Sequence, residues 1–146
     1  MSQTLIIAII GGRRCAFRAE DVKSVIETGA IIPVPRAPEY ILGMTALRSQ
    51  ALTVIDCRAA IGCVDDAHPT DERAAVVSHG GHQFALVVDR VEDIDHALSD
   101  PMPVPGGFGS SWSRLSSGLV ETASGPALLM KIDDLVNPPD HSALAA

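Results

Sequence analysis

Apolar runs and short polar turns alternate along this 146-residue chain, and the length and spacing of the runs favour β-strands. The first run, Leu5–Ile10, does not alternate, because all of its residues are apolar. A strand of this kind needs apolar cover on both faces. We therefore expect one face to fill a barrel and the other to pack against a second half of the protein.

Two glycine pairs stand in similar settings along the chain. Gly11-Gly12 and Gly80-Gly81 each separate two apolar runs, and each copy continues into a segment with acidic residues and valine. Tight hairpin turns need positive φ angles, which glycine adopts freely, so both pairs predict hairpins. The later segments Leu52–Ile61 and Leu128–Val136 also resemble each other. The chain thus contains two similar units.

Each unit has room for about five strands and a small helix, which is what a small β-barrel needs. The expected fold is therefore mostly β, with two small five-stranded barrels packed together and short helices. The first barrel spans about residues 12–64 and the second about 72–136, with the first strand near the seam between them. Residues 137–146 are expected to form a flexible tail.

Two short helices are predicted in the first unit. Within Glu20–Thr28, apolar residues follow helical spacing, and Gly29 provides a stop. Asp56 is a good N-cap for a second helix, which Gly62 ends.

Composition and charge limit the classes of function. Hydrophobic residues make up 47% of the chain and aromatic residues 3%, so the core must be aliphatic. The net charge is −7 and no basic cluster occurs, which argues against nucleic acid as a partner and against a polybasic membrane anchor. The first apolar run is too short to cross a bilayer, and three cysteines fit a reducing compartment. We therefore expect a cytoplasmic protein with no direct membrane insertion.

Cysteine and histidine residues offer a weak case for chemistry. The candidates for a metal site are Cys57, Cys63, His68, His79 and His82. Their spacing does not match the tight ligand pairs of structural zinc sites. The sequence contains no nucleophile elbow, phosphate-binding loop or dinucleotide fingerprint. We therefore expect that the protein is not an enzyme and binds no cofactor or metal. An enzyme or metal protein that uses these cysteine and histidine residues is the less favoured alternative.

Two polar features are candidates for a binding surface. Arg48 stands beside a predicted two-residue turn, where it can meet a partner's carboxylate or form an internal salt bridge with Glu27 or another acid. The charged run from Asp89 to Asp95 is either a solvated face or a partner-binding edge, and solvation does not explain its apolar residues Val91 and Ile94. The residues alone leave both pairs of alternatives open.

The order of motifs from about Thr4 to Val136 resembles the CheW family of chemotaxis coupling proteins. The matching motifs are the Gly11-Gly12 hairpin leading to Glu20-Asp21-Val22, then Pro33-Val34-Pro35, Ala46-Leu47-Arg48-Ser49, Ile55-Asp56-Cys57-Arg58 and Leu86-Val87-Val88-Asp89-Arg90-Val91-Glu92-Asp93. The resemblance implies a single CheW-like domain over residues 1–136, built from two SH3-like five-stranded barrels with a hydrophobic seam. It also implies a non-enzymatic adaptor.

The resemblance further implies partners and a binding site. Family members link the cytoplasmic hairpin tip of a chemoreceptor to the regulatory domain of a CheA-type histidine kinase, in arrays at the membrane. By position, the implied receptor-binding residues are Val22, Ser24, Val25, Ile26, Arg48, Val91 and Ile94. The kinase-binding residues are not assigned.

Some residues depart from the family pattern on the receptor side. Ala46 and Ser49 replace the usual Asn and Gly of the hairpin, and Ser24 stands where Glu is frequent. The alternative expectation is therefore a divergent module that binds the kinase or another partner without receptor coupling, as an array modulator or in a twitching-type pathway.

Overall fold

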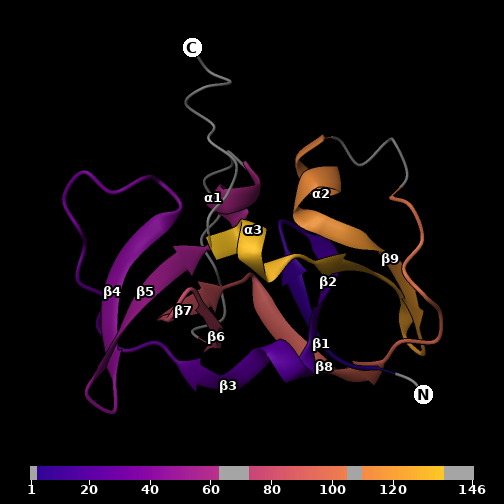
Figure 1. Cartoon of the computed structure of the whole chain (residues 1–146), viewed down its shortest axis with the longest axis horizontal. Helices are drawn as coiled ribbons and strands as arrows, with labels where there is room; N and C mark the ends of the chain where they lie inside the picture. Colours follow the sequence, from indigo (N-terminus) through magenta and orange to yellow (C-terminus); the bar gives the residue numbers. More distant parts are fainter. Residues whose placement is uncertain (1–2, 63–72, 105–109, 137–146) are drawn as a thin grey trace.

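A computed structural model describes residues 3–62, 73–104 and 110–136, and Figure 1 shows their two β-sheets side by side. Sheet A has the strand order β8 (Arg90–His96), β1 (Thr4–Ile10), β2 (Arg13–Arg18), β10 (Gly125–Met130), β9 (Ser116–Thr122). Sheet B has the order β3 (Val22–Glu27), β6 (Arg73–His79), β7 (His82–Val87), β5 (Gln50–Asp56), β4 (Ile41–Leu47). The short helices are η1 (Ala19–Asp21), α1 (Cys57–Ile61), α2 (Ser110–Leu115) and α3 (Ile132–Val136). The predicted fold class, mostly β with two five-stranded sheets and short helices, is confirmed.

The two sequence units exchange strands between the sheets. Strands β1 and β2 of the first unit join β8, β9 and β10, whereas β6 and β7 of the second unit join β3, β4 and β5. Both sheets follow the same order once corresponding strands of the units are matched, so the repeat is confirmed. The division into barrels of residues 12–64 and 72–136 is wrong, because the chain crosses to the other sheet after β2 and again after β7. The predicted tail, 137–146, lies outside the described residues.

The helix predicted over Glu20–Thr28 is also wrong. Its first residues form the 3₁₀ turn η1, and Val22–Glu27 is the strand β3, which pairs antiparallel with β6. A β-bulge between Val22 and Ser24 breaks the two-residue alternation of this strand, which gave it the apparent spacing of a helix. Pairing with β6 satisfies the backbone of a segment rich in β-branched residues.

Three apolar clusters form the core. Two smaller clusters each lie inside one barrel, one formed by residues of sheet A and the other by residues of sheet B. The largest cluster, the seam core, lies between the sheets and contains residues of both. Strand β1 serves two of them: Leu5 and Ile7 enter the interior of sheet A, whereas Ala8 and Ile10 enter the seam core. This confirms the prediction that the first strand is covered on both faces.

The predicted glycine turns and the predicted caps of α1 are confirmed. The glycines of both pairs have positive φ angles, between 58° and 81°, and connect β1 to β2 and β6 to β7. The Asp56 side chain accepts a hydrogen bond from the Arg58 N–H at 3.0 Å, and Gly62 ends α1 with φ 93°.

In each sheet, one strand position must be glycine because another backbone segment crosses close to it. The extended segments after β3 and β8 each form an isolated bridge, Ile32 to Met44 and Met102 to Leu119. At Gly43, with φ +149°, an added Cβ would lie 2.3 Å from the Ile32 carbonyl oxygen. Gly118 has the corresponding place in sheet A, where a Cβ would lie 2.6 Å from the Met102 carbonyl oxygen. A side chain at either position would push the crossing segment away.

We predict that Gly43→Ala lowers the free energy of unfolding by at least about 2 kcal/mol, since the new methyl group meets backbone atoms and the φ angle is unfavourable for alanine. Gly29→Ala is the control, because no atom lies within 4 Å of its added Cβ. Urea unfolding would measure both variants. Equal stabilities of the two would contradict the prediction.

A polar network joins the β8 edge of sheet A to its β9–β10 hairpin. Asp95 on β8 accepts hydrogen bonds from the Ser124 hydroxyl at 2.5 Å and the Ser124 N–H at 3.3 Å. Arg14 on β2 donates to Thr122, Ser124 and Gly125 of the same hairpin. The Ser124 hydroxyl hydrogen bond, followed by the backbone N–H of His96, lowers the pKa of Asp95 from 3.8 to about 2.

We predict that Asp95→Asn destabilises the protein at neutral pH and that the difference from the parent narrows as the pH falls from about 4 to about 2. The lowered pKa gives a stabilising contribution that is present above the usual carboxyl pKa and lost as Asp95 takes up its proton. Urea unfolding across this pH range measures the difference in stability between variant and parent. Asp93→Asn, on the same strand, is the control. A difference that stays constant with pH would rule the mechanism out.

Candidate functional site

The two units each place an edge strand with exposed apolar residues beside the seam. Strand β3 is an edge of sheet B, and β8 is an edge of sheet A. Val22 and Val91 stand equally far after their glycine pairs, and so do Val25 and Ile94. Figure 1 shows both strands along the same lower side of the molecule. The repeat therefore gives each sheet a matching pair of apolar residues on its edge strand.

Burial separates these residues into two groups. Val22 and Val91 are half-buried and pack against the seam core. Val25 is 40% exposed and Ile94 is 65% exposed. The Arg73 guanidinium on β6 donates a 2.9 Å hydrogen bond to the Val91 carbonyl oxygen, which links sheet B to β8. The outer residues are thus exposed, while the inner ones hold the edge strands to the seam.

The other predicted residues lie in sheet B. Ser24 is exposed on β3, and Ile26 is half-buried against the interior cluster of sheet B. Arg48 is exposed in the β4–β5 turn, and it and Ser49 have φ angles of 50° and 69°. Leu47, just before the turn, packs against the same cluster as Ile26. Among the described residues Arg48 forms no salt bridge, so the internal pair with Glu27 is not formed.

The charged run on β8 has two different parts. Its end residues are used inside the protein: Asp89 pairs with Arg58 at 3.0 Å, and Asp95 binds Ser124. Glu92 and Asp93, between them, are exposed. The run is therefore neither a uniform solvated face nor a uniform binding edge.

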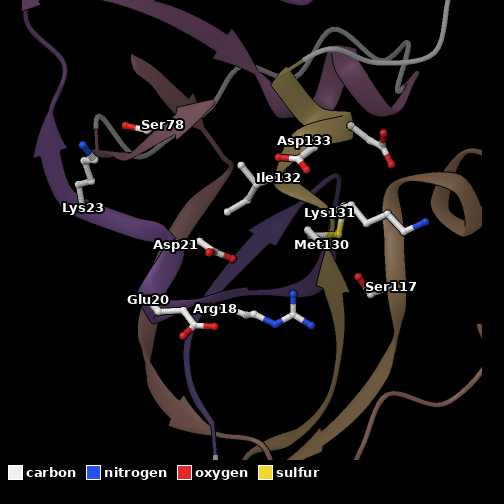
Figure 2. A pocket seen from close by; sticks show the side chains of 11 residues that line it. Arg18, Glu20, Asp21, Lys23, Ser78, Ser117, Met130, Lys131, Ile132 and Asp133 are labelled. Carbon is white, nitrogen blue, oxygen red and sulfur yellow. The ribbon is translucent and has the colours of Figure 1, made fainter. Parts of the chain in front are cut away.

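Sequence reasoning missed a cavity of about 580 Å³ beside the seam. Figure 2 shows Arg18 at the end of β2, Glu20 and Asp21 on η1, and Asp133 on α3 around it. The buried residues Met130 and Ile132 line its apolar part. Arg18 and Asp21 make no ion pair within the described part of the chain. The residues come from segments far apart in the sequence, so no local motif signals this cavity.

The candidate metal ligands do not come together in the described residues, where no group of three or more His, Cys, Asp or Glu side chains is placed to hold an ion. Cys63 and His68 lie outside them. Cys57 is buried, and this desolvation raises the pKa of its thiol well above the usual value. His79 Nδ1 lies 3.0 Å from the Asp133 carboxylate. Within the described ranges, every helix is too short or too polar to cross a bilayer.

The CheW-like domain family matches residues 4–139. The chain belongs to this family. It is 29% identical to the chemotaxis protein CheW of Rhizobium meliloti over 119 residues, which cover 71% of this chain and 76% of that protein. It is 28% identical to protein FrzA of Myxococcus xanthus over 99 residues, covering 67% of this chain and 62% of FrzA.

A solved structure supports the fold of this CheW-like domain. The crystal structure of the scaffolding protein TtCheW from Thermoanaerobacter tengcongensis superimposes with a TM-score of 0.79. The match covers 96% of this chain and 92% of TtCheW at 21% sequence identity. The predicted pair of SH3-like barrels is thereby confirmed. The predicted family, a family of chemotaxis scaffold proteins, is confirmed as well.

Proposed function

We propose that this CheW-like protein is a non-enzymatic adaptor that couples the cytoplasmic hairpin tip of a chemoreceptor to the regulatory domain of a CheA-type histidine kinase. The proposal places it in the cytoplasm, within signalling arrays at the membrane. Family membership supports the general role. The observation that carries the receptor part is the matching pair of exposed apolar residues, Val25 and Ile94, on edge strands of the two barrels.

The receptor tip would lay an apolar helical face over these edge strands. Such docking gains about 25 cal/mol for each Å² of apolar surface buried, before the costs of association are subtracted. Arg48 has no internal partner among the described residues, so its guanidinium is available for a receptor carboxylate. Modest affinity in each contact is offset by the many contacts of an array.

The direct experiment is a titration of this protein against the isolated kinase regulatory domain, with and without a receptor tip fragment. Binding to both partners, separately and together, is the expected result. Binding to neither would overturn the proposal. Binding to the kinase alone would instead support the second candidate described below.

We predict that Ile94→Asp weakens receptor-tip binding at least tenfold, because it places a carboxylate in the apolar contact. Its side chain is already 65% exposed, so folding should be unaffected. Leu98→Asp is the matched control, because Leu98 is also 65% exposed but lies beyond the end of β8. Isothermal titration measures both. Equal receptor affinities of the two variants would show that β8 is not part of the receptor-binding surface.

We predict that Arg48→Ala weakens receptor-tip binding about tenfold through loss of a charge-assisted hydrogen bond, with circular dichroism unchanged. Arg36→Ala, which removes another exposed arginine outside these strands, is the control. If Arg48→Ala bound the receptor as well as the Arg36→Ala variant does, the hairpin would have no part in receptor recognition.

The second candidate is a module that binds the kinase or another partner without a receptor. The observation in its favour is the altered β4–β5 hairpin, in which Ser49 rather than glycine holds a φ angle of 69° and Ala46 replaces the usual Asn. Such a module would act as an array modulator or in a twitching-type pathway. Its kinase-facing residues are not assigned.

A further inference from the structure

The two units place different charges at corresponding positions beside the seam. Arg58 and Asp133 are each the second residue of the helix that follows a unit's last strand. Asp89 and Glu20 are each the second residue after the strand that completes a glycine hairpin. The first pair of positions therefore carries opposite charges, and the second carries two acids.

Arg58 and Asp89, one residue from each of these two comparisons, form a largely buried ion pair, which we name the seam clamp. The guanidinium lies 3.0 Å from the carboxylate, and the two side chains are only 9% and 19% exposed. The same carboxylate oxygen accepts the Gly12 N–H at 3.1 Å, and the Asp89 N–H donates to the Ile9 carbonyl oxygen at 2.8 Å. The clamp thus connects α1, which follows β5 of sheet B, to the β1–β2 hairpin of sheet A.

Glu20 and Asp133, which stand at the positions corresponding to Asp89 and Arg58, are both acids, and among the described residues they form no ion pair with each other. Glu20 and Asp133 both line the 580 Å³ cavity. Asp133 is 80% exposed and bonds instead to His79, which is 38% exposed. Exposed pairs of this kind contribute little to stability. Among the ion pairs of the described residues, the seam clamp is the most deeply buried of those that connect the two sheets.

We propose that the seam clamp is a positioning element that sets the orientation of the two barrels and therefore the spacing of the edge strands β3 and β8. The aliphatic contacts of the seam core are non-directional, whereas a buried, hydrogen-bonded ion pair tolerates a narrow range of distances and angles. Its effect on receptor binding rests on the proposed function. Its effect on strand spacing does not.

The test measures the distance between nitroxide labels at Lys23→Cys on β3 and Asp93→Cys on β8, both exposed positions, in a Cys63→Ser background. The clamp variant is Arg58→Met with Asp89→Leu, which removes both charges and leaves neither buried alone. Its distance distribution should shift or broaden relative to the parent. His79→Gln with Asp133→Asn, which removes the exposed connection between the sheets, should keep the parent distribution.

A conservative variant covers the case in which the double substitution prevents folding. Arg58→Lys keeps the charge but loses the planar guanidinium, so its distribution should also broaden. A parent-like distribution in a folded clamp variant, or in Arg58→Lys when only that variant folds, would overturn the positioning role.

Receptor-tip affinity of the unlabelled proteins gives the second readout. The clamp variant should bind about tenfold more weakly than the parent, and the His79→Gln, Asp133→Asn variant should bind like the parent. If the distances change but the parent binds no receptor tip, the positioning role stands and the proposed function fails. If the parent binds and the clamp variant keeps both its distances and its affinity, the positioning role fails and the proposed function stands.

Discussion

The apolar seam between the two sheets is the constraint on which the rest of the structure depends. Strands of both sequence units contribute to it, because each unit sends its glycine hairpin into one sheet and its other three strands into the other. Neither sheet can therefore form from one unit alone. Packing at the seam brings the two sheets together, and it therefore places the edge strands β3 and β8, with their exposed residues Val25 and Ile94, relative to each other.

Charge makes the seam asymmetric although the backbone repeats. Buried Arg58 pairs with partly buried Asp89 at one of two corresponding positions, while Glu20 and Asp133 line a cavity at the other. Removing one member of a buried ion pair leaves the other charge buried and unpaired, which costs more stability than the intact pair contributes. The positioning role proposed for the seam clamp therefore does not require the pair to add much stability. In an adaptor, a fixed arrangement of the barrels would hold two partners in a defined relation.

Local chemistry was predictable from the sequence, and long-range pairing was not. The glycine hairpins, the Asp56 cap and the two-faced first strand each follow from neighbouring residues, and all are found in the structure. The helix over Glu20–Thr28 failed because a β-bulge imitates helical spacing. The barrel boundaries, the cavity and the seam clamp depend on residues far apart in the chain, so periodicity and local motifs carry no signal for them. Of the residues proposed to bind the receptor, Arg48 was predictably exposed because it lies at a hairpin turn, while the matched edge positions of Val25 and Ile94 could be seen only from the sheet order.

In the proposed function, one molecule of this protein binds receptor and kinase at once. The most direct measurement is sedimentation of the kinase regulatory domain with vesicles that display the receptor tip, in the presence and absence of this protein. We expect the kinase domain to sediment only when the protein is added, and to sediment less when the Ile94→Asp variant replaces the parent protein. Kinase sedimentation that does not depend on the protein would overturn the adaptor role.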